Sequence, residues 1–160
     1  MWYNKLYIKK NHYFPSGDII MEDLQQIATT YVATAKNRLV REGSLTPQSF
    51  VFCDAGVLSI PYVSGDTSAY KRIVTAIAAV SHAHYLIFVA LGNRANFGTR
   101  EQVPQYTNCP DDSIPGSEPC IVVQILSSQQ NVVNFVPYTR IVDAYIFGDV
   151  EVYDISGGLL

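Results

Sequence analysis

Cysteine is scarce in this sequence. The chain contains three cysteines, Cys53, Cys109 and Cys120, which form neither a C-x-x-C pair nor a spaced set of metal ligands. An odd count leaves at least one thiol outside any disulfide framework. The first residues, MWYNKLYIKKNHYF, also lack the apolar segment and cleavage site of a secretory signal. We therefore predict a soluble, cytoplasmic protein rather than a secreted, disulfide-rich one.

Charged residues are also few. The chain has 11 Lys and Arg residues and 14 Asp and Glu residues, which gives a formal net charge of -3 at pH 7. This balance supplies no general basic field, so we expect no nucleic-acid partner and no attraction to anionic lipid. The longest apolar run, residues 85–91, is far shorter than the roughly 20 residues that cross a bilayer, so no membrane association is expected.

Nucleotide-binding and nucleophile motifs are missing from the chain. There is no Walker motif and no G-x-G-x-x-G, and Ser81 does not lie in a G-x-S-x-G elbow. We therefore predict no cofactor, with a divalent metal as the one alternative, considered below. Apolar residues, by contrast, make up 48% of the chain, enough to build the core of one domain of this length.

Two stretches have the periodicity of helices. The first is predicted over 19–42, with charges that suit the helix dipole at both ends and Gly43 as its C-terminal cap. The second begins near residue 67, and its apolar stripe is predicted to be Ile73, Ile77 and Val80.

The remaining periodic segments are predicted strands. The run that follows His84 has no polar residue, so both of its faces should be covered. The last two segments are expected to pair with each other around Gly148 and Asp149. The predicted strands are 49–53, 57–63, 85–91, 120–126, 132–136, 140–147 and 150–155.

Residues 93–119 show no period and contain four prolines, which predicts a long loop. Residues 1–17 are predicted to be an N-terminal arm or an edge strand, 18–155 a single domain, and 156–160 a flexible tail.

The order of these elements is α-ββ-α-β-long loop-βββ. It predicts an α+β fold with an antiparallel-rich sheet of five to six strands and both helices packed on one face. This order is similar to that of profilin-like and roadblock-type modules, which implies a binding or dimerisation unit.

Two histidines are candidate metal ligands. If residues 82–84 are extended, His82 and His84 lie on the same face at a separation that suits one metal ion. A third ligand would have to come from elsewhere. Alternatively, the histidines lie at a helix C-terminus, where positive charge is favourable, and only join helix to strand. The candidates for a third ligand are Asp54, Asp111, Asp112 and Glu118.

The long loop is a second candidate site, because its polar residues suit contact with an anion or a partner. These residues are Arg94, Arg100, Glu101, Asp111 and Asp112.

Tyrosines are numerous, at 11, and six fall on or beside predicted edges and turns, where an interface would use them. Scattered tyrosines are, however, also ordinary on sheet surfaces. The six are Tyr62, Tyr70, Tyr106, Tyr138, Tyr145 and Tyr153.

By elimination, the sequence favours a non-enzymatic protein that forms a homo-oligomer or binds a protein partner. Exposed sheet edges, which oligomerisation would cover, support this hypothesis. The alternative is a metal-dependent hydrolase that uses His82 and His84, with the 93–119 loop as a lid. A third hypothesis is a small-ligand binder with its pocket under that loop.

Overall fold

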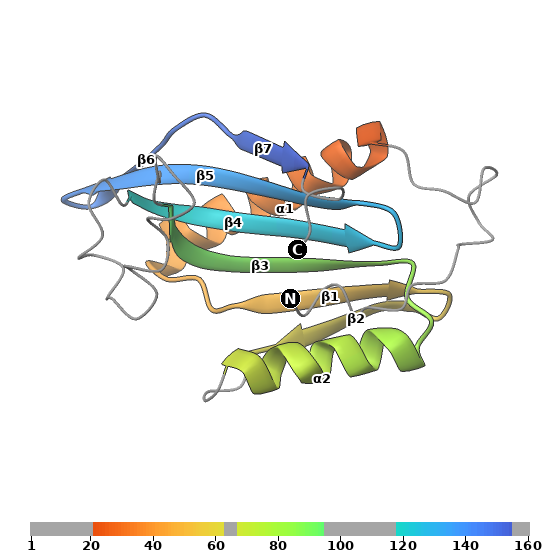
Figure 1. Ribbon diagram of the computed structural model, residues 1–160. Coiled ribbons are helices and arrows are strands. Elements are labelled where there is room, and N and C mark those ends of the chain that lie inside the picture. The colour runs from red at the N-terminus through yellow and green to blue at the C-terminus, as the bar shows by residue number, and fades with distance from the viewer. Residues whose placement is uncertain (1–20, 63–66, 95–117, 155–160) are drawn as a thin grey trace, which may run out of the picture.

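The computed structural model describes residues 21–62, 67–94 and 118–154 (Figure 1). The predicted arm 1–17, the tail 156–160 and most of the 93–119 loop lie outside these residues. The elements are α1 (Met21–Glu42), β1 (Gln48–Cys53), β2 (Gly56–Pro61), α2 (Thr67–Val80), β3 (Tyr85–Arg94), β4 (Glu118–Ser127), β5 (Asn131–Ile141), β6 (Ala144–Phe147) and β7 (Glu151–Asp154). The α+β class is confirmed, and the element order agrees except that four strands, rather than three, follow β3, so that the sheet has seven strands instead of the predicted five to six.

The seven strands form one antiparallel sheet in the order β2-β1-β3-β4-β5-β6, and β7 also pairs with β5. The expected pairing of the last two strands with each other is wrong. β5 runs as far as Ile141 and turns back at Val142, so β6 pairs with residues 138–141 of β5 and β7 with residues 132–135. The Gly148 amide donates to the Pro137 carbonyl at 2.8 Å between the two pairings. β6 and β7 therefore form one interrupted edge.

The two helices pack on opposite faces of the sheet, so the prediction that they share one face is wrong. Successive side chains of a strand alternate between faces. On β3, Ile87 belongs to the core cluster that contains α1, and Leu86 to the cluster that contains α2. Figure 1 accordingly shows α1 behind β4 and β5, and α2 in front, beside β1 and β2. Because β3 is covered on both faces, its run of apolar residues carries no alternation.

The buried face of α1 follows its predicted period, with Leu24 and Leu39 at most 1% exposed. The buried stripe of α2, however, consists of Tyr70, Val74 and Ala78. The predicted stripe is wrong for Ile73, which is 56% exposed, and for Val80, which is 81% exposed. Its third member, Ile77, is partly buried against the α2 core cluster. In the described part of the chain, no helix has the length and apolar character required to span a membrane.

Candidate interaction site at the β2 edge

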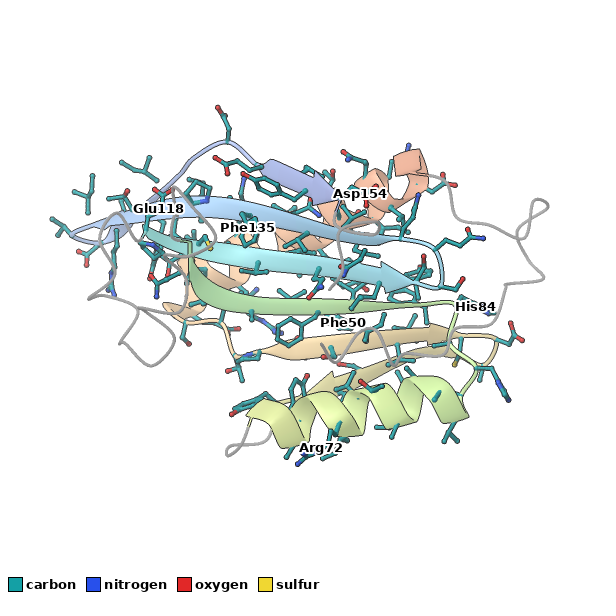
Figure 2. The ribbon with its side chains drawn as sticks, viewed as in Figure 1. Phe50, Arg72, His84, Glu118, Phe135 and Asp154 are labelled. Carbon is teal, nitrogen blue, oxygen red and sulfur yellow. The ribbon has the colours of Figure 1, made fainter. Side chains whose placement is uncertain are left out.

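The predicted histidine pair lies where α2 passes into β3, but the two residues differ in environment. His84 is buried, and its Nε2 lies 2.7 Å from Oδ1 of Asp54, whose carboxylate is mostly exposed. Asp54 occupies the tight turn between β1 and β2. Figure 2 shows His84 at the end of the sheet where these turns meet.

A local irregularity of β3 positions His84. In the register of the sheet, Phe52 pairs with Tyr85. The His84 amide, one residue earlier, also reaches the Phe52 carbonyl, at 2.7 Å. His84, directly before β3, and Tyr85, its first residue, therefore both face Phe52 of β1, which is the arrangement of a β-bulge. The bulge places the His84 ring beside the carboxylate of Asp54.

His82 is part of a helix cap. Its φ angle is 53°, in the left-handed region, and its side chain is exposed. The amide of Ala83 donates to the carbonyl of Ala78 at 3.0 Å, and the amide of His82 to that of Ala79 at 3.3 Å. These two bonds define a Schellman motif with His82 at the position that glycine usually takes. The alternative placement of the histidines at a helix C-terminus thus describes His82.

The extended geometry assumed for a His82–His84 metal site is not formed, because the left-handed His82 turns the chain between α2 and β3. Of the proposed third ligands, Asp54 contacts His84, whereas Glu118 begins β4 at the far end of the sheet (Figure 2). Among the described residues, no group of three or more His, Cys, Asp or Glu could hold a metal ion. Metal binding remains a prediction.

The candidate loop site falls largely outside the described residues. Only the backbone of Arg94 is described, at the end of β3 and paired in register with Glu118. The other four predicted residues of this site, Arg100, Glu101, Asp111 and Asp112, lie beyond the described ranges.

Most of the tyrosines predicted to lie at an interface pack against the core of the fold instead. Tyr70 is buried, and Tyr62, Tyr138 and Tyr145 are partly buried against the core. Burial raises the pKa of the Tyr138 hydroxyl above its ordinary value. Tyr153 is 43% exposed, and Tyr106 lies outside the described residues. The tyrosines therefore do not mark an interface as a group.

β2 forms one of the two edges of the described sheet. The Tyr62 amide donates to the Pro47 carbonyl, and the register continues in steps of two through Ile60 and Leu58. In an antiparallel ladder, alternate residues exchange hydrogen bonds with the partner strand. Leu58, Ile60 and Tyr62 therefore direct their backbone groups toward β1. The intervening residues, Val57, Ser59 and Pro61, direct theirs outward.

The two sheet edges differ in charge. β2, with the sequence GVLSIP, has no charged side chain. The opposite edge, β6 with β7, is interrupted and bears several charges, which are devices that block pairing with another strand. β7 carries Glu151 and Asp154, and the turns beside β6 and β7 carry Asp143 and Asp149, whereas β6 itself has no charge. The turn before β2 carries one charge, Asp54. β2 is therefore the edge better suited to accept another strand.

The exposed apolar flank of α2 faces the same edge. β2 and β3 are parallel, since both are antiparallel to β1, and α2 connects them in the usual right-handed crossover (Figure 1). Viewed from its N-terminus, a right-handed helix turns clockwise by about 100° per residue. Relative to the buried stripe of α2, Ile73, Ile77 and Val80 therefore lie on the counter-clockwise side. In a right-handed crossover this flank points toward β2.

We call the surface formed by Leu58, Ile73, Ile77 and Val80 the α2–β2 patch. Leu58, at 41% exposed, lies on the α2 face of the sheet, since its cross-strand partner Val51 belongs to the α2 core cluster. None of the patch residues is charged, and Arg72 lies on the outer side of α2 (Figure 2). The sequence contained a signal for this surface, because α2 carries a second apolar stripe beyond the one it buries.

A small cavity lies between α1 and β1, with a volume of about 30 Å³. Tyr31, Arg38 and Phe50 are among its lining residues, and Arg38 is held by a 2.9 Å hydrogen bond to Gln48. This volume is about that of one water molecule, whereas a small-molecule pocket needs roughly 300 Å³ or more. The pocket predicted under the 93–119 loop lies outside the described residues.

Comparisons of the chain with models of protein families, with curated proteins and with solved structures find no match.

Proposed function

We propose that this protein is a self-associating module that works through the β2 edge and the α2–β2 patch. The observation that carries the proposal is the coincidence of an uncharged edge strand with an exposed apolar helix flank on the same side of the molecule. Either feature alone is common on monomeric proteins. Together they offer backbone hydrogen bonding and apolar contact to the same partner.

The exposure of the patch gives the proposal its physical basis. Ile73 and Val80 are 56% and 81% exposed, although both are large aliphatic residues in the middle and last turn of a helix. Burial of a side chain of this kind contributes about 1.5–3 kcal/mol when it is complete, so partial burial of several of them supports association. An uncharged edge strand that stayed open to solvent would, moreover, favour uncontrolled aggregation.

The test is the mass of the full chain in solution, measured by light scattering over concentrations up to tens of micromolar. We expect an oligomer that Ile73→Glu dissociates, because the new carboxylate would be buried at the interface without a partner. Val40→Glu is the matched control, since Val40 is 57% exposed on α1, on the other face of the sheet.

The control variant should keep the oligomer. A wild-type protein that is monomeric across this range would contradict the proposal. Equal loss of association in both variants would also count against the patch, because it would indicate a general effect of added charge.

A second candidate function is that of a metal-dependent hydrolase, which the contact between Asp54 and His84 favours. A carboxylate that holds an imidazole in place is a recurrent feature of histidine ligands and histidine bases. Metal analysis of the purified protein tests this candidate, with the His82→Ala and His84→Ala double variant as control. Stoichiometric metal that disappears in the double variant would support it, and metal-free wild-type protein would count against it.

A further inference from the structure

We infer that the partner of this surface is a second copy of the chain, joined through β2 in an antiparallel register centred on Leu58. This inference rests on the proposed function and specifies its geometry. The two copies would share one continuous sheet, with Leu58 of one copy opposite Leu58 of the other at the two-fold axis. The α2 helices of both copies would then lie on the same face of that sheet.

The position of Pro61 selects this register. Only residues with outward backbone groups can exchange hydrogen bonds with a new strand, and on β2 these are Val57, Ser59 and Pro61. Proline has no amide hydrogen to donate. A register centred on Leu58 pairs Val57 with Ser59 of the second copy, and the reverse, so that all four amides and carbonyls are used.

The competing register, centred on Ser59, is poorer. It would also form four hydrogen bonds, two between the Ser59 residues and one in each Val57–Pro61 pair. It would, however, leave both Val57 carbonyls opposite a proline that has no amide hydrogen to donate. A net hydrogen bond contributes about 1 kcal/mol, and an unpaired buried group costs more. The Leu58-centred register avoids this loss at both ends of the ladder.

The chemistry of the patch suits a second copy in particular. A two-fold axis brings a surface against itself, so any charged group near the axis would meet a like charge. The α2–β2 patch has no charged residue, and β2 has none. A partner of a different kind would be selected by complementary charge, and this surface offers none.

The α2 flanks reinforce the same arrangement. In an antiparallel β2–β2 pairing, the two copies of α2 run antiparallel on either side of the axis. Their β2-side flanks, which carry Ile73, Ile77 and Val80, then face one another over the joined sheet. The same contact would cover Leu58 and the exposed apolar residues of α2.

Cysteine cross-linking tests the register. The background variant carries Cys53→Ser and Cys109→Ser, since Cys120 is fully buried. In the Leu58-centred register, residues 58 of the two copies form a pair without hydrogen bonds, with Cα atoms about 4.5 Å apart, within disulfide range. Residues 59 would be roughly 8 Å apart, beyond that range.

We expect Leu58→Cys to give a covalent dimer under mild oxidation, at least tenfold faster than Ser59→Cys. Preferential cross-linking of Ser59→Cys would overturn the register while leaving self-association in place. An oligomer that Ile73→Glu dissociates, but that neither cysteine variant traps, would overturn strand pairing and leave the proposed function standing. A monomer by light scattering would overturn both.

Discussion

Removal of the Tyr70 hydroxyl should destabilise the protein by more than the loss of one hydrogen bond. The hydroxyl donates to the Ile60 carbonyl of β2 at 2.9 Å, and it lies 2.7 Å from Oγ of Ser49. The Tyr70 hydroxyl has one proton and donates it to the Ile60 carbonyl. Ser49 is therefore the donor of the second bond. Burial raises the pKa of Tyr70, and the hydrogen bond with Ser49 opposes that rise. These two bonds fasten α2 to β1 and β2.

The loss in the free energy of unfolding depends on which hydrogen bonds each substitution removes and which buried polar groups it leaves without a partner. Ser49 is 0% exposed, so Tyr70→Phe leaves a buried hydroxyl without this partner. Two lost bonds at about 1 kcal/mol each, with the cost of the abandoned hydroxyl, give about 2–4 kcal/mol. Ser49→Ala leaves the Tyr70–Ile60 bond intact and should cost about 1 kcal/mol. The double variant should cost less than the sum, by about 1–2 kcal/mol.

Urea denaturation of the four proteins at one protein concentration measures these free energies of unfolding. A fixed concentration is needed because association adds to the apparent stability. Single costs that add to the cost of the double variant within about 0.5 kcal/mol would refute the reasoning, since residues that share a bond must couple. A cost of Tyr70→Phe below that of Ser49→Ala would refute it too.

Three further predictions concern other parts of the chain. His82→Gly should stabilise the protein by about 0.5–1 kcal/mol, measured as a rise in the thermal midpoint, because glycine adopts the left-handed cap without strain. Gly148→Ala should lower the thermal midpoint, since its Cβ would lie 2.9 Å from Cγ of Pro137, and a midpoint that did not fall would contradict this packing. Burial, and secondarily Tyr31, raises the pKa of Tyr85 from 10.0 to about 12. A raised folded-state pKa stabilises the fold below the unfolded value, so this contribution should be lost as pH rises from 10 to about 12, and urea titrations of Tyr85→Phe should show a shallower decline.

Much of the secondary structure could be predicted because local signals agree with the final fold. α1 ends at Glu42, before Gly43, whose φ of 72° fits the predicted C-terminal cap. The uninterrupted apolar run from Tyr85 predicted a strand covered on both faces, and β3 has α1 on one side and α2 on the other. In both places, residues close in sequence carry enough information about their surroundings.

The site was harder to predict, because α2 has two apolar stripes and periodicity alone does not show which of them is buried. Ile73, Ile77 and Val80 repeat at helical spacing as well as Tyr70, Val74 and Ala78 do. The buried stripe is the one that contains a tyrosine, since its hydroxyl finds a carbonyl acceptor on β2 and a donor on β1. That choice depends on strands that are distant in sequence.

The sequence by itself determined the class of fold, the order of its elements and the scarcity of charge along β2, because composition and short-range spacing are local properties. Only the tertiary structure decided that the helices lie on opposite faces, that His82 caps a helix while His84 meets Asp54, and that an apolar helix flank adjoins the β2 edge of the described sheet. Each of these depends on which strands become neighbours and on the hand of the crossover between them. No single segment of the chain carries that information.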